Sequence, residues 1–151
     1  MNRREVLGAL AAVTASGAAA AQSAAESGTQ TAASRTGPRN LITDVEGLRI
    51  GHSNDAEIRT GVTVILPDEA AVTACDIRGG GPASRETDVL KPENLVQKVD
   101  AIVLSGGSVY GLASADGIAA RMGARNQGFA LREAPGIPPS PILPTACLYD
   151  L

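Results

Sequence analysis

The sequence predicts an α/β (α+β) fold, in which a sheet of short strands packs against helices. Residues 61–66 and 71–77 are alternating, β-branched runs of the kind that form strands. Residues 101–104 form a short apolar run that leads through glycines into a stretch with helical spacing. The chain has two Tyr, one Phe and no Trp. Its core is therefore built from Ala, Val, Leu and Ile, which suits thin layers of sheet and helix.

The first 21 residues have the features of a signal peptide. Arg3 and Arg4 lie in a short basic start, residues 6–13 are apolar, and small residues follow up to Ala21. The adjacent arginines favour twin-arginine export, and an ordinary Sec signal is the alternative. Because the apolar run is too short to cross a bilayer, we expect no stable membrane span. We expect an exported protein, periplasmic or secreted.

Residues 22–40 are rich in Ala, Ser, Thr and Gly without periodicity, which predicts a flexible linker. The folded part is then residues 41–151. In an exported protein, Cys75 and Cys147 have the chance to form a disulfide. The alternative, which we favour, is that both are small buried apolar residues, because each lies in an apolar, strand-like run.

Composition excludes two classes of partner. The two Cys and single His form no cluster of ligands, so we expect no metal site. The 13 basic residues are outnumbered by 16 acidic ones and form no basic stripe with interleaved aromatics. Nucleic acid is therefore not an expected partner.

Element by element, residues 46–51 predict a short strand. Pro67, Asp68 and Glu69 favour a turn between the runs 61–66 and 71–77, so these two runs are predicted to form an antiparallel hairpin. Residues 78–82 are a glycine-rich loop, and Pro92 suits the first turn of a short helix that ends near Lys98. Residues 101–104 predict a buried strand, and residues 142–149 a final strand. The helix between them has an apolar stripe formed by Val109, Leu112, Ala115, Ile118, Ala119 and Met122.

The segment 106–111, Gly-Gly-Ser-Val-Tyr-Gly, is the best candidate for a functional site. A dinucleotide-binding loop is disfavoured, because Ser108 stands where the pattern needs a glycine. A nucleophile elbow at Ser108 is disfavoured too, because Tyr110 would crowd the turn and the lone histidine, His52, would have to be the base.

A third hypothesis uses this segment as a platform. The backbone N–H groups of Gly106 and Gly107 would bind a carbonyl oxygen as negative charge develops on it. The Tyr110 hydroxyl would donate to the same oxygen or orient a nucleophile. The plain alternative is a tight turn, with Tyr110 packed against the sheet. The residues alone favour that alternative.

Six blocks in a fixed order carry a resemblance to a known family: residues 61–65, 76–80, 85–88, 92–96, 101–112 and 148–151. The chain resembles the L-aminopeptidase/D-esterases, β-peptidyl aminopeptidases and nylon-oligomer hydrolases over residues 41–151. This resemblance implies a four-layer αββα sandwich, of which the chain is the N-terminal portion. It also implies a precursor that cleaves itself and frees a Ser or Thr nucleophile, whose α-amino group acts as the base.

The resemblance places the helix-start tyrosine, Tyr110 here, near that nucleophile, and Gly106 and Gly107 match the loop before it. It implies no cofactor and a peptide or amide substrate, among α-peptides, β-peptides, D-esters and nylon oligomers. The expected partners are the missing C-terminal chain that carries the nucleophile and further copies in a homo-oligomer. Arg85, Glu86 and Asp88 also match, but a solvated turn explains them equally well.

The chain also departs from the family. It ends before the family's nucleophile, so we expect an inactive fragment, truncated artificially or naturally. The alternative is a catalytically inactive exported half-domain that acts as a binding or assembly module. Half of a layered sheet exposes an apolar face, so the isolated fragment is expected to be insoluble or molten. Residues 136–141 are also richer in proline than the family's pattern.

Overall fold

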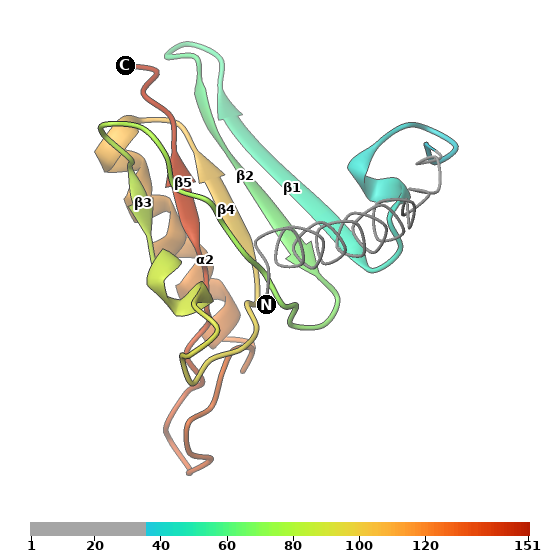
Figure 1. Cartoon of the computed structure of the whole chain (residues 1–151), viewed down its shortest axis with the longest axis vertical. Helices are drawn as coiled ribbons and strands as arrows, with labels where there is room; N and C mark the ends of the chain where they lie inside the picture. The colour runs from blue at the N-terminus through green and yellow to red at the C-terminus, as the bar shows by residue number, and fades with distance from the viewer. Residues whose placement is uncertain (1–35) are drawn as a thin grey trace, which may run out of the picture. The chain divides into compact units, whose positions relative to one another are not determined.

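A five-stranded mixed sheet backed by one α-helix is the main feature of residues 36–151, the part of the chain that the computed structural model describes. The strand order is β1-β2-β4-β5-β3, and only the pair β4–β5 is parallel (Figure 1). The predicted α/β (α+β) class is confirmed. The strands are β1 (Leu48–Asp55), β2 (Thr60–Pro67), β3 (Ser84–Arg85), β4 (Ile102–Ser105) and β5 (Thr145–Cys147); the helices are η1 (Ile42–Asp44), η2 (Thr87–Leu90), η3 (Ser108–Ala113) and α2 (Ser114–Gly123).

β1 and β2 form an antiparallel hairpin, in which the register runs from Leu48 opposite Pro67 to Asp55 opposite Thr60. In the connecting turn the Asp55 carboxylate accepts the backbone N–H groups of Glu57 and Ile58, at 2.9 and 3.2 Å. An aspartate that bonds its own following backbone in this way stabilises a turn locally. The strand predicted at 46–51 is therefore longer than expected and is the first arm of this hairpin.

The predicted hairpin between residues 61–66 and 71–77 is wrong. Both edges of β2 are occupied, one by β1 and the other by β4. Residues 71–77 form no strand, and Ala71 makes only an isolated antiparallel bridge with Val99. Cys75 is exposed in this irregular segment, and Cys147 is half-buried at the end of β5. Both cysteines are free, and the burial predicted for Cys75 is wrong.

The strand, glycine turn and helix predicted after residue 100 are confirmed, with one correction. The first turns after the glycines are the 3₁₀-helix η3, and the α-helix begins only at Ser114. A 3₁₀-helix has three residues per turn, so the apolar stripe does not continue through it. Val109 is accordingly 60 % exposed, whereas Ala115 and Met122 are buried against the sheet.

Two further elements differ from the prediction. Residues 92–98 form turns and no helix. The Asn94 side-chain amide donates to the Asp88 carbonyl, and the Gln97 side-chain amide donates to the Asn94 carbonyl. Such side-chain bonds compete with the backbone hydrogen bonds that a helix needs. The final strand is limited to Thr145–Cys147. Beyond it the Leu148 N–H donates to the carbonyl of Ser105, the last residue of β4, and the Leu148 carbonyl accepts the Ser108 N–H of the following turn.

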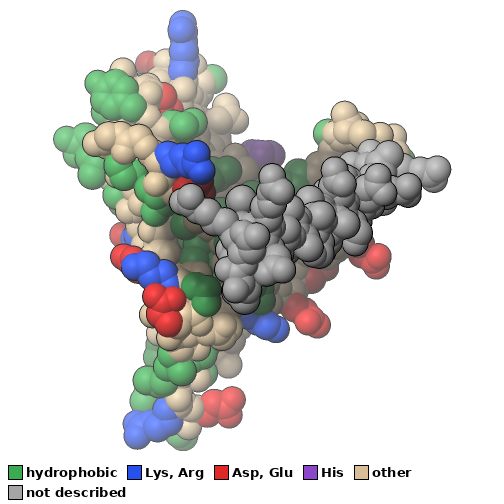
Figure 2. All heavy atoms as spheres, in the orientation of Figure 1, with side chains coloured by type: hydrophobic (Ala, Val, Ile, Leu, Met, Phe, Trp, Pro, Cys, Tyr) green, Lys and Arg blue, Asp and Glu red, His purple; other side chains and the backbone are tan. Residues whose placement is uncertain are grey.

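The core lies between the sheet and α2, which is behind the sheet in Figure 1. Val62 and Val64 of β2 and Val103 of β4 point to this side, together with Leu143 before β5. The alternate residues of the same strands point to the other face. That open face carries Ile50, Thr63, Ile65, Ile102 and Leu104, of which Leu104 is 44 % exposed. Figure 2 shows the charged side chains of both signs scattered over this side of the molecule.

The predicted signal peptide, 1–21, and most of the predicted linker, 22–40, lie outside the described residues. The last linker residues are in a turn, in which the Asn40 N–H donates to the Gly37 carbonyl. Arg39 also pairs with Asp44, so contacts with the folded part begin a few residues before position 41. Among residues 36–151, no helix combines the length and the apolar character needed to cross a membrane.

Candidate functional site

The glycine turn that follows β4 lies where three strand ends meet. β4 ends at Ser105 and the parallel strand β5 ends at Cys147, so the chain leaves both strands at the same end of the sheet. β2 is antiparallel to β4 and therefore begins at this same end of the sheet, with Val62 opposite Ser105. A pocket of ≈ 300 Å³ opens here, lined by Thr60, Gly61, Val62, Ser105, Gly106, Gly107, Tyr110, Gly111 and Ser114.

The turn requires glycine at two positions for different reasons. Gly107 has φ of +79°, a left-handed conformation that glycine adopts without steric cost. At Gly106, a Cβ atom would overlap the Asp150 carboxylate and the Thr60 hydroxyl. Ser108 is also left-handed, with φ of +54°. Two consecutive left-handed residues, one of them not glycine, persist only where surrounding contacts hold them.

Backbone hydrogen bonds supply those contacts. The Gly106 N–H donates to the Gly61 carbonyl at 2.8 Å, which ties the turn to β2. The Gly107 N–H donates to Oδ1 of Asp150 at 2.5 Å. The Ser108 N–H donates to the Leu148 carbonyl at 2.8 Å. The oxyanion role predicted for Gly106 and Gly107 stays a prediction, and each N–H would first have to leave the acceptor that it has here.

Tyr110 lies on the wall of this pocket, in η3, and its side chain is 77 % exposed. Within residues 36–151 its hydroxyl makes no hydrogen bond. Of the plain alternative, the tight turn is present, but the packing of Tyr110 against the sheet is wrong. An exposed phenol beside a pocket is able to donate a hydrogen bond to, or accept one from, a bound molecule.

Four polar groups of the site were not predicted from the sequence. Ser105 is buried, and its hydroxyl donates to the Gly106 carbonyl at 3.0 Å. The Ser114 hydroxyl oxygen is buried without a hydrogen-bond partner in the described part of the chain. Thr60 and Asp150 bond to each other, from Oγ1 to Oδ2, at 2.9 Å. Ser105 and Asp150 fall within the resemblance blocks 101–112 and 148–151, but no role was predicted for either of them, and Thr60 and Ser114 lie outside the blocks.

Asp150 sets the electrostatics of the site. The Gly107 N–H and the Thr60 hydroxyl donate hydrogen bonds to its carboxylate. These bonds, chiefly the one from Gly107, hold the pKa of Asp150 below its ordinary value of 3.8. The neighbouring Cys147 behaves in the opposite way. Burial, followed by the negative charge of Asp150, raises the pKa of its thiol. At neutral pH the site therefore contains an ionised carboxylate next to a protonated thiol.

The other residues that the family resemblance singled out have structural contacts. Arg85 Nη1 donates to Asp116 at 2.6 Å and thereby joins β3 to α2. The Glu86 carboxylate accepts the Leu143 N–H at 2.7 Å, and Asp88 pairs with the adjacent Lys91. His52 is on β1, where its Nδ1 atom lies 2.9 Å from the Thr63 hydroxyl. No hydrogen bond joins His52 to Ser108 in the region described, as the nucleophile-elbow hypothesis would need.

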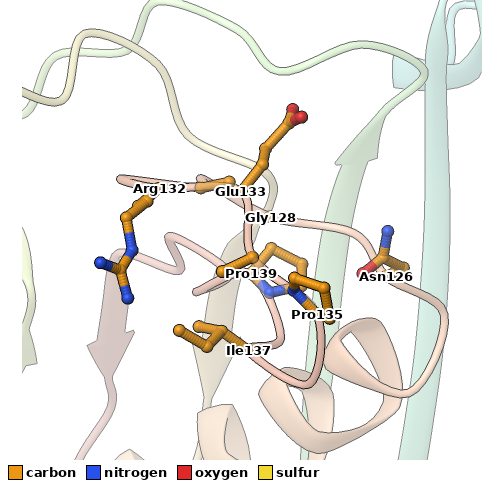
Figure 3. Close-up of a pocket in the computed structure, with 9 residues that line it drawn as sticks. Asn126, Gly128, Arg132, Glu133, Pro135, Ile137 and Pro139 are labelled. Atoms are coloured by element: carbon orange, nitrogen blue, oxygen red, sulfur yellow. The ribbon is translucent and has the colours of Figure 1, made fainter.

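A larger pocket, of ≈ 480 Å³, lies in the loop between α2 and β5. Nine residues between positions 126 and 139 line it, and the only charged side chains among them, Arg132 and Glu133, point in opposite directions (Figure 3). It contains no hydroxyl, thiol or histidine that would act as a nucleophile or base. Residues 36–151 also hold no group of three or more His, Cys, Asp or Glu side chains that would bind a metal ion. The pocket beside Tyr110 contains all three predicted site residues, Gly106, Gly107 and Tyr110, and is the candidate site.

Comparison with known proteins gives the family. A protein named uncharacterized aminopeptidase from Mycobacterium tuberculosis is 46 % identical over 120 residues, covering 74 % of this chain and 34 % of that protein. One of the same description from Mycobacterium leprae is 43 % identical over 122 residues, covering 76 % of this chain and 33 % of that protein. The chain thus spans about a third of the length of these relatives. Residues 40–145 match Peptidase family S58, and the chain belongs to this family, that of the L-aminopeptidase/D-esterases.

Proposed function

We propose that this chain supplies one wall of the active site of an aminopeptidase-type amide hydrolase. The nucleophile, a Ser or Thr freed by self-cleavage, belongs to a part of the protein outside these 151 residues. The observation that carries the proposal is the exposed Tyr110 phenol, which lies on a pocket where three strand ends meet and makes no hydrogen bond with any other residue of the range 36–151. The names of the mycobacterial relatives support it, as does the match of this chain to only about a third of their length.

In the proposed reaction the nucleophile hydroxyl attacks the carbonyl carbon of the scissile amide, and its proton passes to the nucleophile's own α-amino group. The carbonyl oxygen becomes negative, and the Tyr110 phenol donates a hydrogen bond to it or orients the attacking hydroxyl. The C–N bond then breaks, and the α-ammonium group returns the proton to the leaving amine. Water attacks the resulting acyl ester by the same route and releases the acid. No cofactor takes part.

The open face of the sheet supports a larger domain. Ile50, Ile65, Ile102 and Leu104 point away from α2, and within the described residues no second layer covers them. An apolar sheet face of this kind is stable in water only when another layer packs on it. We propose that the remainder of the protein adds a second sheet here and completes the four-layer αββα sandwich.

The test uses the complete gene product, meaning whatever the reading frame encodes from Met1 to its stop codon. Hydrolysis of amino-acid p-nitroanilides is measured for this protein and for the Tyr110→Phe variant. Loss of one hydrogen bond to developing charge is expected to lower kcat about 100-fold. Tyr149→Phe is the matched control, because Tyr149 is the other tyrosine of the chain and is equally exposed.

The 151-residue chain alone is expected to hydrolyse none of these substrates. Hydrolysis by that chain, abolished by Tyr110→Phe, would contradict the proposal that the nucleophile lies elsewhere. A stop codon after Leu151, together with a soluble and inactive product, would favour the exported half-domain that acts as a binding or assembly module. We propose, too, that the protein is exported and forms homo-oligomers. Cell fractionation would test the export, and light scattering of the complete gene product would test the oligomeric state.

A further inference from the structure

The Asp150 carboxylate connects two segments that are far apart in the sequence. Oδ1 accepts the Gly107 N–H at 2.5 Å, and Oδ2 accepts the Thr60 hydroxyl at 2.9 Å. Thr60 begins β2 and Gly107 follows β4, so one carboxylate bonds to both of these neighbouring strand ends. We call Thr60, Gly107 and Asp150 the clasp.

The clasp lies against the strained part of the glycine turn. Gly107 and Ser108 are both left-handed, and the segment that carries Asp150 bonds to each of them. The Ser108 N–H donates to the Leu148 carbonyl, and the Leu148 N–H donates to the Ser105 carbonyl, both at 2.8 Å. The charge on Asp150 makes its bond to Gly107 the strongest type in this set.

Tyr110 depends on this turn for its position. Its side chain is exposed, and its hydroxyl makes no hydrogen bond in the described part of the chain, so side-chain contacts hold it only weakly. The backbone from Gly107 to Tyr110 therefore determines where the phenol lies in the pocket. A displacement of about 1 Å at a reacting group is enough to cost one to two orders of magnitude in rate.

We infer that Asp150 is a positioning residue, which fixes the glycine turn through Gly107 and Thr60 and thereby holds Tyr110 at the pocket. This inference rests on the proposed function of Tyr110. The absence of space around Gly106 supports it, because a Cβ atom there would overlap both the Asp150 carboxylate and the Thr60 hydroxyl. The close fit shows that the turn and the clasp are packed together.

The first measurement follows amide hydrogen exchange at Gly107 and Ser108 in the complete gene product. Asp150→Ala removes both acceptors, and exchange at Gly107 is expected to become about tenfold faster. Asp150→Asn keeps an acceptor for Gly107 and a donor for Thr60, and about a threefold change is expected. Asp68→Ala is the matched control, because Asp68 pairs with Arg49 at the opposite end of β2.

The second measurement separates kcat from KM on an amino-acid p-nitroanilide. Asp150→Ala is expected to lower kcat about tenfold and to change KM less than about twofold, because the substrate still binds while the phenol is misplaced. Thr60→Val is expected to lower kcat about threefold, and Thr60→Ser to restore it. A role in stability alone would leave the kcat of the folded fraction unchanged and would give no rescue by the conservative variants.

The two measurements separate the possible failures. Unchanged exchange at Gly107 in Asp150→Ala would overturn the clasp, whatever the activity. Faster exchange with an unchanged kcat would overturn the positioning role. A complete gene product that hydrolyses no amide would overturn the proposed function, and the exchange rates alone would then decide whether the clasp holds the turn.

Discussion

β4 and residues 71–77 are both short, apolar and rich in β-branched residues, yet only one of them is a strand. β4 bonds to β2 on one side and to β5 on the other, and its Val103 is completely buried. Residues 71–77 pair with no strand of the sheet. Their one β-bridge in the described part of the chain joins Ala71 to Val99, just before β4, and Val72 is 79 % exposed. The difference teaches that strand propensity alone does not make a strand. β2, the predicted partner of residues 71–77, is already paired on both sides.

The largest expected effect compares a buried with an exposed valine of these two segments. Val103→Asp places a carboxylate without a partner among Ala101, Met122 and Leu143. We expect it to lower the free energy of unfolding by about 4 kcal/mol or more. Val72→Asp is expected to change it by less than about 0.5 kcal/mol. Urea unfolding of the complete gene product measures both, and equal losses would contradict the contrast between the segments.

A smaller effect is expected from glycines. Gly106→Ala forces the Asp150 carboxylate or the backbone to move, at a cost of about 1–3 kcal/mol in the free energy of unfolding. Gly80 lies in the loop beyond residues 71–77, and a Cβ atom there meets nothing. Gly80→Ala is expected to be neutral or to stabilise by up to about 1 kcal/mol, because it restricts the unfolded chain. Thermal melts of the two variants would show whether the turn after β4 is the tightly packed one.

The third comparison concerns the salt bridges of two arginines. Arg85 joins β3 to α2 through Asp116, whereas Arg78 pairs with Asp76 two residues away. Both arginines are exposed, so Arg85→Ala is expected to cost about 0.5 kcal/mol, and Arg78→Ala nothing measurable. Urea unfolding detects the difference. A larger loss in Arg78→Ala would mean that its loop is held more firmly than its contacts indicate.

The smallest effect is expected from acid. The pKa of Asp150 is lower in the folded protein than its ordinary value of 3.8, because the Gly107 N–H and the Thr60 hydroxyl favour the ionised form. The stabilisation is therefore complete above about pH 3.8 and is lost as the pH falls through the folded pKa. The difference in unfolding free energy between the natural protein and Asp150→Asn is expected to be constant near neutral pH. It should shrink only below 3.8, and a change around pH 6 would contradict the assignment.

Local pattern predicted the parts of the fold that depend on neighbours in the sequence. The strand at 101–104, the glycine turn and the helix containing Ala115 and Met122 are each specified by a short run of consecutive residues. The hairpin prediction failed because the choice of partner for β2 was not local. The helix expected at Pro92 failed because the Asn94 and Gln97 side chains bond to the backbone in turns.

The same distinction applies to the site. Gly106, Gly107 and Tyr110 are within five residues of one another, and a single motif predicted all three. Thr60 and Asp150 are 90 residues apart, and only the sheet order brings them together. No property of either residue alone distinguishes it from the many threonines and aspartates on a protein surface. A site made at the ends of several strands is therefore predicted only in its contiguous part.

The loop between α2 and β5 offers a place to attach a reporter. Phe129 and Ser140 exchange two backbone hydrogen bonds of 2.9 Å, so the two ends of residues 130–139 already lie side by side. When the ends of a loop are fixed, lengthening it costs little free energy. A fluorophore or an affinity tag inserted after Gly136 would therefore leave the sheet undisturbed. Such a label would make export and assembly of the protein visible without altering Tyr110 or the clasp.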